Sequence, residues 1–260
     1  MKKLALALFL AAAATSGADA AQPQVLKCPT VTGDPTIYGI GGSTMGTLLG
    51  PMLEAVLEEH GIDFRRWGKA SSGLARPDFH DWPKETPAIM KKHDPDIVVV
   101  SLGTNDYQPL WVGKNDWIQQ DDPKWETVYG DRVDALLEAI AGDDKERLII
   151  WSGPYAFTGP NAEKRAPIVN RIMRERVEAY AAAGGHAIFH DAYAPTSDAN
   201  GKPLSEAVLA GKGAKAVKIR SKDGIHLTAD AVRALLAKPI VDMVMPCFPN
   251  TEKKTEPKPK

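Results

Sequence analysis

The sequence predicts an α/β protein with a mostly parallel central sheet that helices cover on both faces. Short apolar runs bounded by turn residues alternate with longer amphipathic stretches, which is the pattern of βαβ units. The clearest strand is Ile97–Leu102, because a continuous apolar run is typical of a central strand buried on both sides. The chain has 260 residues, 43% of them hydrophobic, which is enough for one sizeable core. We therefore expect a single domain over residues 21–249.

The remaining strands and helices follow from local patterns. Strands are expected at Thr36–Ile40, Phe64–Lys69, Arg147–Trp151 and His186–His190. Helices are expected at Met45–Leu57, around Ile89 and Met90, at Val133–Ile140, at Pro167–Ala183 and after Thr228. Thr228 is the expected N-cap of the last helix, since apolar residues recur at helical spacing behind it.

Two connections, Asp106–Lys124 and Ala192–Lys222, are longer than usual links in a compact domain. Such loops are commonly lids or binding loops. The first carries Tyr107, Trp111 and Trp117 in polar surroundings, so these rings are candidates for stacking on a sugar. The alternative is that they cover a small apolar core beneath the loop.

The first residues of the sequence predict a targeting signal. Two lysines precede an apolar run from Leu4 to Ala14, and Ala18-Asp19-Ala20 follows, so residues 1–20 are predicted to be a cleaved secretory signal peptide. The apolar run is shorter than the roughly 20 residues that span a bilayer, and no later segment of that length is free of charges. We expect a periplasmic or secreted protein without stable membrane insertion.

The C-terminal residues 250–260 contain no apolar side chain and cannot bury surface, so a disordered tail is expected. The two cysteines, Cys28 and Cys247, lie near opposite ends of the mature chain. Disulfides persist in an oxidising compartment, so we predict a bridge between them. Two unpaired buried thiols are the alternative.

Charge and motif content exclude several classes of function. Removing Lys2, Lys3 and Asp19 from 32 basic and 33 acidic residues leaves 30 and 32, a net charge of −2. That balance gives no electrostatic footprint for nucleic acid or anionic lipid, so a small or neutral polymeric substrate is favoured. No His, Cys or carboxylate cluster has metal-ligand spacing, and no Gly-rich phosphate loop with Lys is present. We expect no metal and no organic cofactor.

Ser43 is a candidate nucleophile. It follows the first predicted strand and opens a helix, which would place its hydroxyl at the carboxyl edge of the sheet, where ligands bind in open α/β folds. Gly41 and Gly42 before it permit a tight turn. A plain helix N-cap serine is the alternative.

Asp223 precedes His226 by three residues, just before the last helix. In a turn, that spacing lets the carboxylate reach the imidazole Nδ1 and leave Nε2 facing a nucleophile. Either residue alone could be a surface group or, for the acid, part of a helix start. Together with Ser43 they form a candidate triad for acyl transfer.

Two further segments offer donors for a developing oxyanion. Asn105 follows the central strand, so its amide is expected at the same sheet edge as Ser43. Gly73 follows the second strand and offers an unhindered backbone N–H. The alternatives are a turn-forming Asn-Asp pair and an ordinary loop glycine.

These segments, in this order, resemble the blocks of the SGNH, or GDSL-like, hydrolase superfamily. The matching blocks are Gly41-Gly42-Ser43, Gly73, Gly103-Thr104-Asn105-Asp106 and Asp223-Gly224-Ile225-His226. The stretch from Ser72 to Phe79 with Asp81-Trp82-Pro83 is also similar to a bacterial periplasmic branch of uncharacterised function. One departure is Gly42, because the family usually has Asp there. A Gly-x-Ser-x-Gly elbow is absent around Ser43, which disfavours an ordinary α/β-hydrolase.

The resemblance implies a flavodoxin-like three-layer α/β/α fold and an exported serine esterase. Ser43 would be the nucleophile, His226 the general base and Asp223 its orienting acid. The oxyanion donors would be the backbone N–H groups of Ser43 and Gly73 and the Asn105 side chain. The expected substrate is an O-acetyl ester on a cell-envelope or extracellular glycan. An O-acetyltransferase on the same glycans and an inactive glycan-binding scaffold of the same fold are the alternatives.

Overall fold

The computed structural model describes residues 26–143 and 146–250, so the predicted signal peptide and the tail beyond Asn250 lie outside the described residues. The central strands are β1 (Ile37–Gly41), β2 (Phe64–Gly68), β3 (Ile97–Ser101), β6 (Leu148–Ser152) and β7 (Ala187–His190). They form one sheet in the order β2-β1-β3-β6-β7, with every neighbouring pair parallel. The predicted α/β class and parallel sheet are confirmed.

The strands are in register at their carboxyl ends. Gly41 pairs with Ser101, Ser101 with Ser152, and Ser152 with His190. All five residues of β3 are buried, as expected for a strand between two helical layers. The loops that leave β1, β3 and β6 therefore start from one edge of the sheet, the edge at which open α/β folds bind ligands.

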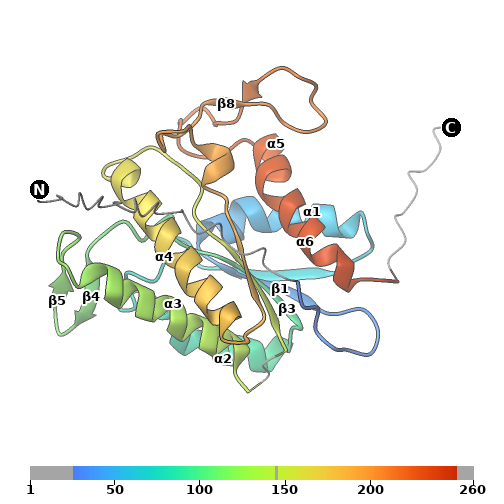
Figure 1. Ribbon diagram of the computed structural model, residues 1–260, viewed down its shortest axis with the longest axis horizontal. Coiled ribbons are helices and arrows are strands. Elements are labelled where there is room, and N and C mark those ends of the chain that lie inside the picture. The colour runs from blue at the N-terminus through green and yellow to red at the C-terminus, as the bar shows by residue number, and fades with distance from the viewer. Residues whose placement is uncertain (1–25, 144–145, 251–260) are drawn as a thin grey trace, which may run out of the picture.

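Helices cover the sheet on both faces (Figure 1). The α-helices are α1 (Leu49–Glu58), α2 (Trp82–His93), α3 (Trp125–Ala141), α4 (Ala162–Ala182), α5 (Ala229–Ala231) and α6 (Lys238–Val244). One apolar core joins α1 and the C-terminal helices to the sheet, and a second core joins α2, α3 and most of α4 to the other face. This is the predicted three-layer arrangement.

Helix ends follow their local chemistry. Asp81 caps α2, its carboxylate accepting the N–H of Lys84 at 3.3 Å, and Asp94 ends the helix in the left-handed region before Pro95. Thr228 caps the C-terminal helices as predicted, accepting the N–H of Ala231. The start of α4 was predicted wrongly at Pro167, since the helix begins at Ala162.

The two long connections carry short hairpins. Asp106–Lys124 contains β4 (Leu110–Gly113) and β5 (Asp116–Ile118), and Ala192–Lys222 contains β8 (Glu206–Ala207) and β9 (Val217–Lys218). Among the described residues, no helix has both the length and the apolar character to cross a bilayer.

The C-terminal helices contain a π-helical segment, Val232–Ala237, between α5 and α6. Pro239 has no N–H, so the Leu235 carbonyl four residues earlier lacks its usual helical partner. His190 at the end of β7 hydrogen-bonds to that backbone group. Its Nδ1 lies 3.0 Å from Ser152 Oγ, so the ring links the sheet edge to the C-terminal helices.

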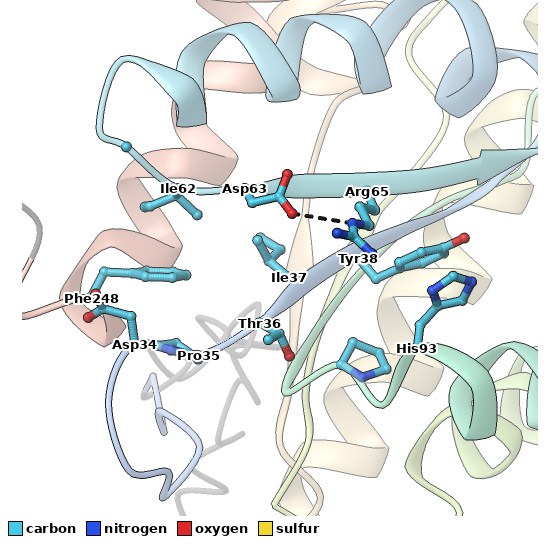
Figure 2. Close-up of a pocket in the computed structure, with 12 residues that line it drawn as sticks. Asp34, Pro35, Thr36, Ile37, Tyr38, Ile62, Asp63, Arg65, His93 and Phe248 are labelled. Atoms are coloured by element: carbon cyan, nitrogen blue, oxygen red, sulfur yellow. Dashed lines mark hydrogen bonds and ion pairs between the residues drawn. The ribbon is translucent and has the colours of Figure 1, made fainter.

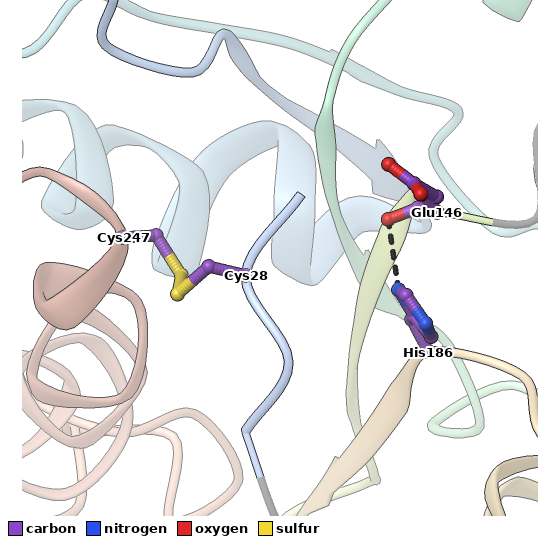
Figure 3. The surroundings of a disulfide bond; sticks show 4 residues. All are labelled: Cys28, Glu146, His186 and Cys247. Atoms are coloured by element: carbon purple, nitrogen blue, oxygen red, sulfur yellow. Dashed lines mark hydrogen bonds between the residues drawn. A yellow bond between two sulfur atoms is a disulfide. The ribbon is translucent and has the colours of Figure 1, made fainter. Parts of the chain in front are cut away.

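Cys28 and Cys247 form a disulfide, with Cα atoms 5.2 Å apart (Figure 3). Cys28 lies in the irregular segment ahead of β1, and Cys247 ends a short 3₁₀ turn, Met245–Cys247, that follows α6. The bridge therefore ties the first described residues of the chain to the segment that follows α6. The predicted pairing is confirmed.

Candidate active site

Three residues that are far apart in the sequence line one pocket of about 200 Å³: Ser43, Asn105 and His226. Ser43 and Asn105 follow the carboxyl ends of β1 and β3, and His226 comes from the turn before the C-terminal helices. The alignment of the strand ends explains why the first two meet. The pocket is small and partly open to solvent.

The turn into Ser43 depends on a glycine at the end of β1. A Cβ at Gly41 would lie 2.1 Å from the backbone oxygen of Ser101, so only glycine fits. Beside it, the Gly42 N–H donates to the same Ser101 oxygen at 3.1 Å. This contact fixes the chain as it leaves the sheet and places Ser43 at the sheet edge.

Ser43 itself has helical backbone angles and its side chain makes no capping hydrogen bond. The interpretation of Ser43 as a helix N-cap is therefore wrong, because its hydroxyl accepts no capping hydrogen bond from the helix backbone. A π-helical turn, Thr44–Leu48, precedes α1, and its Gly46 packs closely on Gly68 at the end of β2. A Cβ on Gly68 would lie 2.4 Å from the Gly46 nitrogen, so two glycines allow the start of this helix to lie on the sheet edge.

Asp223 and His226 are joined within one turn. The His226 Nδ1 lies 2.7 Å from Asp223 Oδ2, and Asp223 Oδ1 accepts the backbone N–H groups of Ile225 and His226 at 2.9 and 3.0 Å. The hydrogen bond from His226, followed by these backbone bonds, lowers the pKa of Asp223 to about 2. An ionised carboxylate on Nδ1 fixes the tautomer in which Nε2 is the free, basic nitrogen.

Arg220 braces this turn from behind. Its guanidinium donates to the carbonyl oxygens of Leu204, Thr196 and Ile225 at 2.8, 3.0 and 3.2 Å. It also lies over the ring of Tyr155 at 5.9 Å. The Arg220 side chain thus links the long loop Ala192–Lys222 to the turn that carries His226.

In the part of the chain that the structure describes, no hydrogen bond joins the side chains of Ser43 and His226. Both line the same pocket, and the His226 side chain is 58% exposed. Catalytic hydrogen bonds are often long before substrate binds and shorten in the complex. A hydroxyl and an imidazole that line one pocket can therefore come into contact when a ligand binds.

The Asn105 side chain is hydrogen-bonded to Ser72, the residue before Gly73. One amide hydrogen of Asn105 Nδ2 is donated to the Ser72 oxygen at 2.9 Å, which orients the second hydrogen. Gly73 does not line the pocket with Ser43. It borders a neighbouring cavity of about 290 Å³, together with Trp82 and Arg132. Among the described residues, its N–H makes no hydrogen bond.

The three aromatic candidates are in different places. Tyr107 lines the pocket and its ring lies 5.3 Å from that of Phe157. Trp111 and Trp117 face each other across the β4–β5 hairpin and are not among the residues that line the pocket. A role for these two in binding stays a prediction. Trp125, just beyond the hairpin, is fully buried at the start of α3.

One wall of the pocket was not predicted from the sequence. It is formed by residues of the loop after β6, namely Tyr155, Phe157, Thr158, Gly159 and Pro160, with Thr44, Thr47 and Leu48 from the first helical turns. The signal was present, because this loop leaves a predicted strand at the ligand-binding edge and carries two aromatic residues. Burial raises the pKa of Tyr155 to about 12, so its hydroxyl stays neutral.

A larger cavity of about 310 Å³ lies at the amino ends of β1 and β2 (Figure 2). Figure 2 shows the stacked rings of Tyr38 and His93 and the exposed pair of Arg65 and Asp63 around it. This is the edge opposite to Ser43, and ligands in open α/β sheets bind at the carboxyl ends. Within the described residues, no group of three or more His, Cys, Asp or Glu could hold a metal ion.

Comparison with family models matches residues 36–242 to the model described as "Protein of unknown function (DUF459)". Comparison with curated proteins gives no match. The family model spans all four of the segments that carry the candidate site.

Solved structures share the fold at low sequence identity. A protein from Parabacteroides merdae ATCC 43184, described as a GDSL-like lipase, is 17% identical, with TM-score 0.53, 85% of this chain and 98% of that chain covered. An acetyl esterase mutant solved with an acetate ion is 12% identical, with TM-score 0.53 and coverage of 82% and 99%. A carbohydrate esterase family 2 enzyme from Corynascus thermopiles is 17% identical, with TM-score 0.50 and coverage of 84% and 69%. The fold is that of the GDSL-like, or SGNH, hydrolases.

Proposed function

Since the chain belongs to the family described as DUF459 and has the SGNH hydrolase fold, we propose that it is a serine esterase. The observation that carries the proposal is the convergence of Ser43, Asn105 and His226 on one pocket, with Asp223 bound to the imidazole. A nucleophile, a base, a group that orients the base and an oxyanion donor are the parts that acyl transfer requires.

In the proposed reaction, Ser43 Oγ attacks the ester carbonyl while His226 Nε2 takes the hydroxyl proton. Asp223 stays ionised and stabilises the imidazolium, in line with its lowered pKa. The backbone N–H groups of Ser43 and Gly73 and the Asn105 amide stabilise the oxyanion. His226 then protonates the leaving alcohol, and water, activated by the same imidazole, releases the acid from Ser43.

The proposed substrate is an O-acetyl ester on a cell-envelope or extracellular glycan. A pocket of about 200 Å³ suits a short acyl group. Its wall combines the rings of Tyr107 and Phe157 with the hydroxyl groups of Thr44, Thr47 and Thr158, a mixture suited to a sugar next to the ester. Two of the solved structures of this fold are described as acetyl or carbohydrate esterases, which supports the same substrate class.

We further propose that the enzyme acts in the periplasm or outside the cell. The N-terminal Lys2, Lys3 and the apolar run to Ala14 support a cleaved signal peptide. The disulfide between Cys28 and Cys247 supports an oxidising compartment.

Acetate release from isolated envelope glycans tests the proposal, with wild type and Ser43→Ala measured in parallel. Ser43→Ala should lower the rate at least about a thousandfold, because the nucleophile is lost. Asn105→Ala should lower kcat by roughly a hundred to a thousandfold without unfolding the protein. Equal acetate release by wild type and Ser43→Ala would refute the esterase.

Two additional measurements separate the alternatives. If a glycan acceptor diverts acetyl groups from free acetate to a new ester, the protein is an O-acetyltransferase that uses the same acyl-enzyme. The absence of a serine-directed phosphonate adduct on Ser43 in folded protein would favour the inactive glycan-binding scaffold over the esterase.

A further inference from the structure

The carboxylate of Asp106 contacts the loop that carries Gly73. Asp106 follows Asn105 at the sheet edge, yet its side chain has no exposed surface. Its Oδ1 accepts the backbone N–H of Ala75 at 2.8 Å, and the backbone N–H of Leu74 is a second donor to the same carboxylate. A fully buried acid thus binds the two peptide groups that come directly after Gly73.

Helix α3 completes the surroundings of this acid. The Tyr129 hydroxyl donates to Asp106 Oδ2 at 2.9 Å and is itself fully buried. Arg132, one turn further along, donates to the carbonyl oxygens of Leu74 and Ala75 at 2.8 and 3.1 Å. Burial raises the pKa of Asp106, and the donors from the loop, Tyr129 and the charge of Arg132 oppose that rise. The Leu74 and Ala75 N–H groups and the Tyr129 hydroxyl all donate to the carboxylate, which is the environment of an ionised acceptor.

Gly73 and Asp106 fit each other sterically. A Cβ at position 73 would lie 2.1 Å from Asp106 Oδ1, so the carboxylate occupies the space that any side chain would need. On the other side of Gly73, the Asn105 amide holds the Ser72 oxygen at 2.9 Å. Two consecutive residues of the loop after β3, Asn105 and Asp106, therefore hold the chain immediately before and immediately after Gly73.

We propose that Asp106 is a positioning residue that directs the Gly73 N–H, together with the Asn105 amide, at the oxyanion. The inference depends on the proposed esterase function. Asp106 does not touch the substrate and acts through the Leu74 and Ala75 amides that it holds. Because an oxyanion donor contributes mainly in the transition state, its misplacement lowers kcat and leaves KM nearly unchanged.

Two substitutions at position 106 separate positioning from simple packing. In Asp106→Asn, the amide oxygen can accept the loop N–H groups while its NH₂ donates to the Tyr129 hydroxyl oxygen, so the loop is held without the charge. Asp106→Ala removes every one of these bonds. With p-nitrophenyl acetate, we expect kcat of Asp106→Ala to fall about a hundredfold with KM within about threefold of wild type, and Asp106→Asn to stay within about tenfold.

Tyr129→Phe is the second variant, in case Asp106→Ala does not fold. It removes one hydrogen bond to the carboxylate and leaves the loop contacts in place, so kcat should fall by roughly threefold to tenfold at constant KM. Circular dichroism and a melting curve establish which variants are folded at the assay temperature.

The proposal is overturned if folded Asp106→Ala keeps kcat within twofold of wild type, or if Asp106→Asn is as slow as Asp106→Ala. It is also overturned if KM rises while kcat stays constant. Should Asp106→Ala not fold, a wild-type kcat in Tyr129→Phe overturns it. A wild type no faster than Ser43→Ala refutes the esterase itself, so the two failures are distinguishable.

Discussion

Acidification from pH 7 to pH 5 is expected to destabilise this protein by about 2 kcal/mol through one buried histidine, His190. The ring is 4% exposed at the carboxyl end of β7, where it contacts Ser152 and the Leu235 backbone. Burial, the largest cause, lowers its pKa from 6.5 to about 4. The neutral ring is therefore the folded form over most of this range.

Acid destabilises the folded protein because the proton binds to His190 in the unfolded chain. Between pH 6.5 and about 4 the unfolded chain protonates this histidine and the folded protein does not, so unfolding takes up a proton. Stability is complete above the unfolded pKa and is lost as the pH falls toward the folded pKa. For a shift from 6.5 to about 4, proton linkage gives a loss of about 2 kcal/mol at pH 5 relative to pH 7.

Urea unfolding at both pH values measures this loss. His190→Gln keeps a neutral side chain with a donor and an acceptor but cannot titrate, so its loss between pH 7 and pH 5 should be about 2 kcal/mol smaller than in wild type. His60→Gln, in the turn after α1, is the matched histidine substitution. Identical pH dependence in wild type and His190→Gln would refute the reasoning.

Three other predictions concern the site and the termini. Arg220→Lys cannot hold three carbonyl groups in the geometry of a guanidinium, so kcat should fall about tenfold or more with a modest change in Tm, and wild-type kinetics would contradict the bracing role. Gly42→Ala would place a methyl carbon 3.1 Å from the Ser72 oxygen. The resulting backbone shift should lower kcat by roughly tenfold in a folded protein, and an unchanged kcat would contradict this prediction. Replacing Cys28 and Cys247 by Ser opens a loop of 219 residues, whose closure stabilises the folded protein by up to about 5 kcal/mol through chain entropy. Tm should therefore fall by about 10 to 20 °C in a melting curve, and a drop of under about 2 °C would argue against this contribution of the disulfide.

The sequence was sufficient to predict the strands of the sheet and to predict that Ser43 and Asn105 lie at the same sheet edge. Buried parallel strands are read from continuous apolar runs such as Ile97–Leu102, and residues that follow such strands meet at one edge for geometric reasons. The Asp223–His226 pair was also predictable, because its contact lies within a single turn.

Contacts between distant loops were not predictable in the same way. The helix α4 extends ahead of Pro167 because Ala162 and Ala166 are buried in the core on the other side of the sheet, and a local pattern contains no such information. The matched fit of Gly73 and Asp106 is likewise a tertiary contact. The wall after β6 has an irregular backbone, so its direction depends on the neighbours it packs against.

The disulfide between Cys28 and Cys247 also sets an order of events during synthesis. Synthesis proceeds from the N-terminus, so Cys28 is made long before Cys247, its partner 219 residues later. The covalent link can therefore close only after the chain has been made as far as Cys247. Any earlier folding must proceed with Cys28 still reduced or temporarily linked to another thiol, and closure marks maturation.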